Sequence, residues 1–539
     1  MNWKKYFNKF WLPPIQPTET ELKHWASSEW VEYQAWLFHH SFVSLYQWQQ
    51  LRAEVRRWSS KPLISLVTPV FNTPPAYLQA CLYSVQTQIY PYWELCLVND
   101  GSTYPETLAC LQTFVDTDPR IRIQHLSHNQ GICQATHQAI NMARGDYIAF
   151  LDHDDRLAID ALYHLAQTIL NWPNLDVIYS DRDMLSPQGL RFMHLLKPAW
   201  SPETLLSGNY LFHLVLYRRA LLEQLQGVRI GFEGSQDYDL ILRAADNPIE
   251  VHHIPKILYH WRQHEHSVAQ VHDVKEYAYT AGIKALENTL ERRGLCGQVS
   301  ENKALWRGNY RVQLQPSAHC SIHLLQLTHV HDYAQQINQA LSTHTQADII
   351  VILGPSVQPL DAETVTELTN WLQIAAVGIV TAKVIDAQQR LLHAGLVHRP
   401  HGLPLAIYEH FPEKTSGYMA VTQSLRNLSA PHPGCWALKR SLWQQLGGLD
   451  EHYAGPHAAF DLALKSLKIG MRIVYTPFAR FSATEWQTPE HWPQQDRQHF
   501  VTRWQSWLEQ GDPYYNPYLT LELTDMGLNM HSPYVTQRA

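Results

Sequence analysis

The feature that most constrains the fold is a regular alternation of short apolar runs and longer amphipathic segments between residues 62 and 155. Runs rich in β-branched and aromatic residues predict strands at Ile64–Phe71, Trp93–Val98, Ile121–Leu126 and Tyr147–Leu151. Segments with helical spacing lie between them, at Tyr77–Gln88, Glu106–Asp116 and Gly131–Ala143. Strands that alternate with helices in this way predict right-handed crossovers and a parallel sheet, and therefore an α/β fold.

Composition narrows the class of protein. The chain has 539 residues, of which 45% are hydrophobic and 17% are charged, and these values are typical of a globular protein with several folding units. Its formal net charge of −7 argues against a nucleic-acid binder that depends on neutralising phosphates. No apolar run is long enough for a bilayer-spanning helix or for a secretion signal, so we expect a cytoplasmic location. The seven cysteines are scattered, which favours free thiols over a disulfide framework or a thiolate zinc site.

Changes in composition and in the spacing of apolar residues along the chain predict four regions. Residues 1–60 have the spacing of helices, and we expect either packing on the next domain or a peripheral contact with a membrane or a partner. A main domain is expected at 61–300, a second and related domain at 301–490, and a C-terminal tail at 491–539. Two pairs of similar segments support an internal, diverged repeat. They are Leu216–Arg219 with Ala437–Arg440, and Gln236–Leu240 with Ala458–Leu462.

Polar side chains follow three of the predicted strands. Asn72, Asp100 and Asp152 each come directly after an apolar run, at the carboxyl ends where open α/β sheets bind ligands. Asp152 begins the run Asp-His-Asp-Asp, whose carboxylates could hold a divalent cation, Mg²⁺ or Mn²⁺, together with substrate phosphates. The alternative is a solvated acidic turn in which Asp155 caps the following helix.

Asp100 and three further residues, Asp237, His260 and Arg262, could also take part in binding or catalysis. Asp100 could accept a hydrogen bond from a base or a ribose, or it could belong to an ordinary turn. Asp237 stands at a predicted helix start, where it could serve as a general base or simply as a helix-terminal carboxylate. His260 could ligate a metal and Arg262 could contact phosphate, although a histidine at a strand end is more often structural.

Taken together and in order, these landmarks resemble the family 2 inverting glycosyltransferases of the GT-A (Rossmann-like) fold. The similarity covers residues 63–268 and points to bacterial enzymes of O-antigen and capsule assembly, which often carry two such domains. The segments that carry it are Thr68–Asn72, Val98–Ser102, Asn129–Gly131, Phe150–Asp155, Tyr179–Asp181, Glu233–Asp239 and Tyr259–Arg262.

The resemblance implies a role for each matching residue. Asp237 would be the catalytic base, while Asp152 and Asp154 would form the Asp-X-Asp motif that holds the metal and the sugar diphosphate. His260 would be a further contact to the metal or phosphate. The residues that would line the nucleotide pocket are Pro69, Phe71, Asn72, Asp100 and Gly131.

The chain departs from the family pattern at identifiable places. Arg182 stands where relatives often have an acidic residue, which puts the roles of Asp181 and Asp183 in doubt. In the second domain, the run Ile352–Ser356 has no carboxylate where relatives carry an acidic motif, and the acids near the base position are reduced to Asp461. We therefore expect this degenerate GT-A-like domain to transfer no sugar.

The favoured interpretation is a metal-dependent transferase that moves a sugar from a UDP- or dTDP-linked donor to a glycan or lipid-linked glycan acceptor, with no nucleic-acid partner. For such an acceptor we expect the protein at the inner face of the bacterial inner membrane, in peripheral contact. One alternative is a non-catalytic assembly protein that binds nucleotide-sugar or polymer. Another is a nucleotidyltransferase, but no Gly-rich basic loop follows the first strand to hold a triphosphate.

Overall fold

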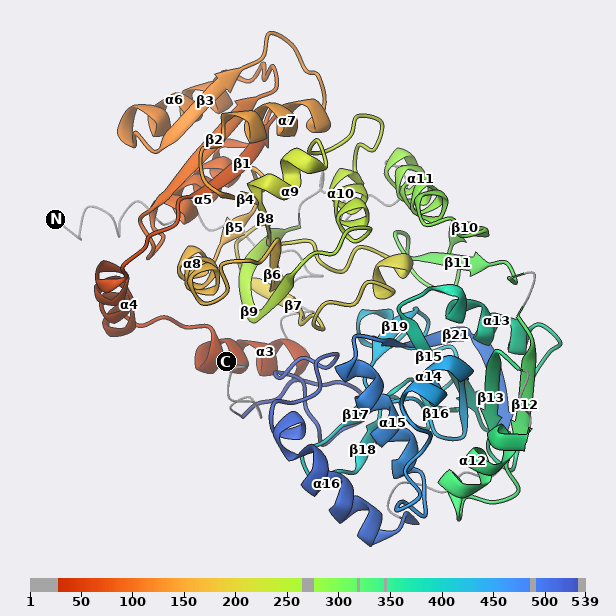
Figure 1. Ribbon diagram of the computed structural model, residues 1–539. Coiled ribbons are helices and arrows are strands. Elements are labelled where there is room, and N and C mark those ends of the chain that lie inside the picture. The colour runs from red at the N-terminus through yellow and green to blue at the C-terminus, as the bar shows by residue number, and fades with distance from the viewer. Residues whose placement is uncertain (1–27, 264–275, 318–319, 344–346, 485–490, 532–539) are drawn as a thin grey trace. The chain divides into compact units, whose positions relative to one another are not determined.

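The structure is a computed structural model that describes residues 28–263, 276–317, 320–343, 347–484 and 491–531 (Figure 1). The chain divides into two compact units. The first unit contains Met1–Lys197 and Leu211–Ala285, and the second contains Pro198–Tyr210 and Leu286–Ala539. The second unit thus begins before the expected boundary at residue 300 and takes in the region predicted as a separate C-terminal tail.

The first unit is built on a nine-stranded sheet with the order β3-β2-β1-β4-β8-β6-β9-β5, and β7 pairs with β6 beside this path. Its strands are β1 Ile64–Val70, β2 Trp93–Asn99, β3 Ile121–His125, β4 Tyr147–Phe150, β5 Arg156–Leu157, β6 Val177–Leu185, β7 Arg191–Leu195, β8 Val215–Arg218 and β9 Val251–Arg262. The first four strands are parallel, which confirms the pairing predicted from the alternating pattern. Strand β8 runs antiparallel to β4 and to β6, so the whole sheet is mixed.

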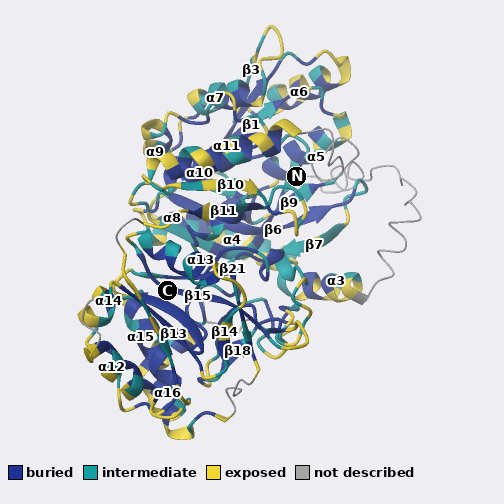
Figure 2. Ribbon diagram, turned by 90° about the vertical axis from the view of Figure 1, so that its right-hand side faces the viewer, coloured by how far each residue is buried: buried dark blue, intermediate teal, exposed yellow. Residues whose placement is uncertain are grey.

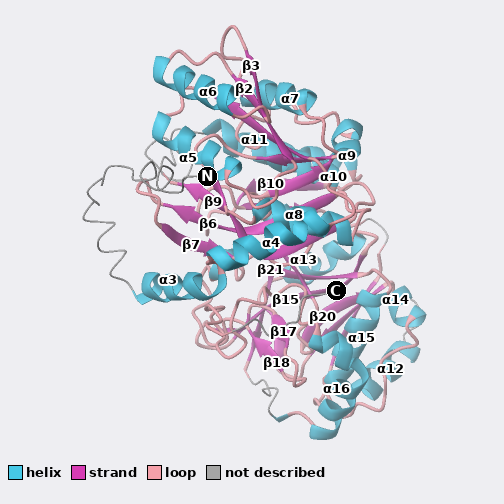
Figure 3. Cartoon of the chain, turned by 90° about the vertical axis from the view of Figure 1, so that its left-hand side faces the viewer, coloured by secondary structure: helices cyan, strands magenta, loops and turns pink. Residues whose placement is uncertain are grey.

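Helices flank the parallel part of this sheet (Figure 3). The helices of the first unit from α5 onward are α5 Pro75–Gln86, α6 Pro105–Thr117, α7 Ile132–Met142, α8 Ala161–Asn171, α9 Arg219–Gln224, α10 Gln236–Ala244 and α11 Glu276–Arg292, which continues into the second unit. Every residue of β2 is buried, and the strands are mostly coloured as buried in Figure 2. Burial on both faces explains why β1 and β2 read as continuous apolar runs.

Two helices precede the sheet, α3 (Ser28–His40) and α4 (Leu45–Arg57). Ser44 begins α4 with a reciprocal capping box to Gln47, and Val55 packs into the core of the first unit. The expected helical character is therefore confirmed from residue 28 onward, and residues 1–27 lie outside the described part. No helix among the described residues combines the length and the apolar character needed to cross a membrane.

The second unit has an eight-stranded main sheet with the order β12-β13-β20-β15-β21-β14, and β16 and β19 pair beside this path. Two further sheets have two strands each, β10 with β11 and β17 with β18. The strands of the second unit are β10 Gly297–Glu301, β11 Tyr310–Leu314, β12 Ile322–Gln326, β13 Ile349–Leu353, β14 Val357–Pro359, β15 Val377–Ile385, β16 Leu391–His393, β17 Leu396–His398, β18 Pro404–Ala406, β19 Arg426–Leu428, β20 Cys435–Lys439 and β21 Arg472–Ala483. Its α-helices are α12 Tyr333–Thr343, α13 Thr364–Asn370, α14 Arg440–Gln445, α15 His457–Lys468 and α16 Gln494–Glu509. Short 3₁₀ helices are η1 Thr204–Ser207, η2 Trp371–Gln373 and η3 Tyr418–Ala420.

The main sheet of the second unit repeats the strand order of part of the first. The path β1-β4-β8-β6-β9-β5 corresponds to β12-β13-β20-β15-β21-β14. Each pair of neighbours also keeps its direction, from the parallel pairs β1/β4 and β12/β13 to the antiparallel pairs β5/β9 and β14/β21. No counterpart of β2 and β3 occurs on this path among the described residues.

Equivalent hydrogen bonds show which residues occupy corresponding positions in the two sheets. The backbone N–H of Arg219 donates to the carbonyl of Asp146 over 2.8 Å, and that of Arg440 donates to the carbonyl of Asp348 over 2.9 Å. Counting forward from these carbonyls, Gly354 occupies the position of Asp152, six residues on. The segments predicted to be a repeat therefore lie at corresponding places in the two sheets.

Candidate active site

The loops after β1 and β2 meet at the carboxyl edge of the parallel strands. Asn72 lies in the left-handed region with φ +45°. Its backbone N–H donates to the Ser102 hydroxyl over 2.9 Å, and its side-chain oxygen accepts from the N–H of Thr103 over 2.8 Å. Pro69 lies near the end of β1 and is half-buried, and Phe71 follows the strand with an exposed ring. The edge thus combines a fixed polar residue with an exposed aromatic ring.

Asp100 is buried and organises the loop that follows β3. One of its carboxylate oxygens accepts the N–H of Gln130 over 2.7 Å, and the other accepts the N–H of Gly131 over 2.9 Å. Gly131 has φ +89° and stands immediately before α7, and a Cβ there would meet open space. The structure therefore brings Asn72, Asp100 and Gly131 to one edge, as the strand order predicts, and shows that Asp100 also braces that edge.

Replacing Gly101 with Ala should destabilise the first unit. Gly101 has φ +68°, and an added Cβ would lie 2.5 Å from the carbonyl carbon of His128. The left-handed conformation alone costs about 1–2 kcal/mol for an L-residue, and the backbone overlap adds to it. Urea denaturation of the G101A variant should show this loss. The matched control is Gly189→Ala, which shares a positive φ of +84° but whose nearest contact is 3.8 Å away. An equal loss in both variants would contradict the steric argument.

The acidic loop follows β4 directly. Asp155 is buried, and it accepts the Tyr259 hydroxyl over 2.6 Å and the backbone N–H of Arg262 over 2.7 Å. Burial, together with the charges of Asp154 and Asp152, raises the pKa of Asp155 well above its usual range. Asp155 does not cap a helix, because it precedes β5 and α8 begins only at residue 161. The loop therefore concentrates three carboxylates at the sheet edge and uses the third to fix its own shape.

His213 is the site residue that sequence reasoning missed. One ligand atom each from Asp152, Asp155 and His213 lie within 4.8 Å of one another, a grouping that could hold a metal ion. The ring of His213 stacks on that of Tyr259, with centroids 4.8 Å apart. Burial and the nearby charges of Arg182 and Lys197 lower its pKa well below the usual value. His213 lies some 60 residues from the acidic run and belongs to no local motif, so no sequence signal singles it out.

The structure does not bring His260 to this group. Its Nδ1 lies 2.6 Å from a carboxylate oxygen of Asp183, which is fully buried and also accepts from Arg191 and Tyr33 over 2.6 Å each. Burial acts to raise the pKa of Asp183, but the charges of His260 and Arg191 outweigh it and bring the pKa to about 2. The physical reason is strand alternation: Tyr259 faces the acidic loop, so its neighbour points to the other face.

Asp237 is the second residue of α10, two after the N-cap Ser235, and is half-buried. Burial raises the pKa of the Tyr217 hydroxyl, and the charge of Asp237 adds to this effect. The ring of Tyr217 meets that of Phe150 edge-on at 5.6 Å. Phe150 is the last residue of β4, two before Asp152, so Tyr217 contacts the strand that leads into the acidic loop. The segment before α10 also reaches α7, because Glu233 is hydrogen-bonded to Cys133.

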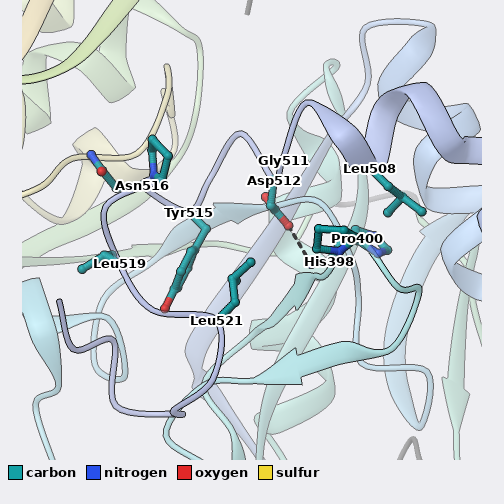
Figure 4. A pocket seen from close by; sticks show the side chains of 10 residues that line it. His398, Pro400, Leu508, Gly511, Asp512, Tyr515, Asn516, Leu519 and Leu521 are labelled. Atoms are coloured by element: carbon teal, nitrogen blue, oxygen red, sulfur yellow. Dashed lines mark hydrogen bonds between the residues drawn. The ribbon is translucent and has the colours of Figure 1, made fainter. Parts of the chain in front are cut away.

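A separate small pocket lies in the second unit (Figure 4). His398, Tyr515 and Leu519 are among its lining residues, and Asp512 accepts the backbone N–H of His398 there over 3.0 Å. The same carboxylate oxygen of Asp512 also accepts the hydroxyl of Ser429. None of the sequence-predicted site residues lines this pocket, and its carboxylate already serves the fold.

Comparison with known proteins shows similarity both to a protein family and to individual proteins. Residues 65–225 match the family described as Glycosyl transferase family 2. The chain is 31% identical to the uncharacterized protein y4gI of Sinorhizobium fredii and 30% identical to the O-antigen biosynthesis protein RfbC of Myxococcus xanthus, with 88% of this chain covered in each case. It spans 59% of y4gI and 42% of RfbC, less than two thirds of either relative.

Among solved structures, the chain is similar to Staphylococcus aureus TarS in complex with UDP-GlcNAc. The match has 19% identity and a TM-score of 0.35, and it covers 43% of this chain and 72% of that one. The family match falls on the sheet that carries the site, from β1 to α9. Residues 65–225, which include Asn72, Asp100 and Asp152, are therefore similar to the glycosyltransferases of family 2.

Proposed function

We propose that the first unit transfers a sugar from a nucleoside-diphosphate donor to a hydroxyl group of a growing bacterial surface glycan. The observation that carries the proposal is the convergence of the Asn72, Asp100 and Asp152 loops at one edge of a family 2 glycosyltransferase sheet. The similarity to an O-antigen biosynthesis protein over 88% of the chain supports a surface polysaccharide as the product.

The loops after β1 and β2 would bind the nucleotide. Each oxygen of Asp100 already accepts one backbone N–H and keeps a second lone pair, with which it would accept the imide N–H of uracil or thymine. Gly131 lets the nucleotide approach the start of α7, where the N–H groups of a helix N-terminus favour an anion. The Phe71 ring and Pro69 would pack against the base.

Asp152 and Asp154 would hold a divalent metal with the donor diphosphate. Their side chains offer the hard oxygen ligands that Mg²⁺ and Mn²⁺ prefer. Burial and, after it, the charges of Asp154 and Asp152 raise the pKa of Asp155, and a cation would relieve that negative charge. When bound, the metal would act as a Lewis acid on the diphosphate. Arg262 braces the loop by donating through Nε to the carbonyl of Asp154 over 2.7 Å.

Asp237 would act as the general base of a single displacement. It would take the proton of the acceptor hydroxyl as that oxygen forms a bond to the anomeric carbon. The bond from that carbon to the diphosphate oxygen breaks on the opposite face, so the nucleoside diphosphate leaves and the configuration inverts. A placed base of this kind contributes about 10²–10⁴-fold to the rate.

We further propose that the second unit is a copy of the same domain that has lost its chemistry. At the positions of Asp152 and Asp154 it has Gly354 and Ser356, and Ala459 stands where the repeat would place the base. Asp461 is retained, but it is buried and pairs with Lys465 four residues on, as Asp239 pairs with Arg243. What survives is therefore the carboxylate that holds the helix, which suits a scaffold or an acceptor platform.

The test is turnover of a panel of nucleotide-sugars by the purified chain with Mn²⁺ or Mg²⁺ and a glycan acceptor. We expect release of free nucleoside diphosphate that depends on both donor and acceptor. The Asp152→Ala variant should weaken metal-dependent UDP binding by about tenfold or more, because it removes a carboxylate from the site. Ser356→Ala, at the position in the second unit that corresponds to Asp154, should leave this binding unchanged. Release of pyrophosphate in place of the diphosphate would instead indicate a nucleotidyltransferase.

A further inference from the structure

His213 is placed beside the acidic loop by contacts that fix its backbone. The buried side chain of Lys197 donates through Nζ to the carbonyls of Leu211 over 2.6 Å and of His213 over 2.7 Å. Arg182 donates through Nε to the carbonyl between them, that of Phe212, over 3.2 Å. Three successive carbonyls are therefore held by two basic side chains, which leaves the segment little freedom.

Arg182 is itself fixed by aromatic rings. Its guanidinium carbon lies 4.7 Å from the ring centre of Phe212 and 4.6 Å from that of Trp261. This is the residue that departs from the family pattern, and its placement gives it a structural role, because it secures the segment that presents His213.

The imidazole of His213 faces the carboxylates of the loop. Its Nε2 lies 3.7 Å from an Oδ of Asp152, which is longer than a hydrogen bond. Two ligand atoms on one Mg²⁺ or Mn²⁺ ion, at bond lengths of about 2.1 Å, stand about 3.0 Å apart when adjacent and about 4.2 Å apart when opposite. The observed separation falls between these values, so only a small rearrangement is needed for both atoms to bind one ion.

Tyr259 joins His213 to the rest of the loop. Its ring lies under the imidazole at 4.8 Å with an angle of 19° between the planes, and its hydroxyl donates to Asp155 over 2.6 Å. The N–H of Asp152 in turn donates to the same hydroxyl oxygen over 3.2 Å. Movement of the imidazole is thereby coupled to the shape of the acidic loop. His260, by contrast, has its Nδ1 committed to Asp183.

We propose that His213, with Asp152, supplies the imidazole ligand of the metal that binds the donor diphosphate, in place of His260. The proposal rests on the proposed function, since it needs a divalent metal at Asp152. Imidazole is a common metal ligand in proteins, and one nitrogen in the ligand set favours a transition metal such as Mn²⁺ over Mg²⁺, which prefers oxygen.

The test measures Mn²⁺ affinity from the electron paramagnetic resonance signal of unbound Mn²⁺, in the presence of UDP and without turnover. The full-length chain is compared with His213→Phe, which keeps a ring to stack on Tyr259 but has no ligand nitrogen. We expect the H213F variant to bind Mn²⁺ at least about tenfold more weakly, as for loss of one ligand. His39→Ala, on the exposed side of α3, is the control and should bind as the unmodified chain does.

The outcomes separate this proposal from the proposed function. If the unmodified chain binds neither UDP nor Mn²⁺, the proposed function fails. If it binds both and H213F binds Mn²⁺ equally well, the assignment of His213 fails while the function stands. A His260→Ala variant that loses Mn²⁺ while H213F retains it would also overturn the assignment. If H213F does not fold, as judged by its melting curve, His213→Ala gives the same comparison.

Discussion

Replacing Asp237 with Asn should abolish sugar transfer while donor binding persists. Asparagine keeps the size and polarity of the side chain at the start of α10 but cannot take the proton of the acceptor hydroxyl. We expect kcat to fall by about 10²–10⁴-fold with little change in the KM for the donor. The measurement is nucleoside diphosphate release under saturating donor, together with calorimetric titration of UDP and Mn²⁺.

Asp239 offers a matched control on the same helix. It is fully buried, and Arg243 donates to it through Nε over 2.8 Å and Arg229 over 2.9 Å. Because its role is to hold the helix and the segment before it, Asp239→Asn should lower the melting temperature. D237N should leave it nearly unchanged, since Asp237 is only half-buried. Full activity in the D237N variant would remove Asp237 from the role of base.

The parallel core of the first unit could be predicted from the sequence because its constraint is local. Strands buried on both faces must be apolar along their whole length, so β1 and β2 stand out as runs bounded by turns. Parallel pairing then sends the carboxyl ends of β1, β2 and β4 to one edge, which is why the meeting of Asn72 with the Asp100 loop could be anticipated.

The side-chain directions beyond that edge could not be predicted. Whether His260 or its neighbour faces the acidic loop depends on the register of β9, and β9 has irregularities opposite Asp181. A shift of one residue in a strand exchanges its two faces. The position of His213 was harder still to predict, because it is set by contacts with Lys197 and Arg182, which lie in other segments of the chain. Such contacts leave no periodic signal.

Comparison of the two sheets distinguishes carboxylates that stabilise the fold from those that would take part in the chemistry. Both units keep a buried carboxylate in the helix before the last long strand, paired with a basic residue four positions on. Only the first unit keeps Asp152 and Asp237, and both of these are at least partly exposed. Partly exposed acids that have no counterpart at the matching positions of the second sheet are poorly explained by stability, which supports their assignment to the site.

The second unit should lose stability steeply in mild acid, because it buries neutral histidines. Burial, with the charge of Arg426, lowers the pKa of His393 to about 3, and burial lowers the pKa values of His398 and His457 to about 4. In the unfolded chain the pKa of these groups is about 6.5. Below that pH the unfolded chain binds protons at these histidines and the folded unit does not, so the stability present above pH 6.5 is lost as pH falls toward 4.

The contacts of the buried histidine rings explain why they stay neutral in the folded unit. His393 and His432 stack with ring centres 4.2 Å apart, and the Nδ1 of each accepts a backbone N–H, from Gly395 and Gly434 respectively. Protonation would remove both acceptors and place charge in a closed interior. His398 stacks on the ring of Phe500 at 5.6 Å.

Below pH 6.5, each of the three histidines lowers the free energy of unfolding by about 1.4 kcal/mol per pH unit. The loss by pH 5 is therefore about 2 kcal/mol for each histidine, and the sum is a large part of a typical domain's stability. The raised pKa of Glu367 offsets some of this at lower pH. Hydrogen exchange of the whole chain at pH 7, 6 and 5, corrected for intrinsic rates, should show β15, β20 and β21 losing protection. His398→Phe should reduce the pH dependence by about one proton, whereas His331→Asn, at an exposed position, should not. Equal protection of these strands at pH 7 and pH 5 would show that the histidines are protonated within the fold.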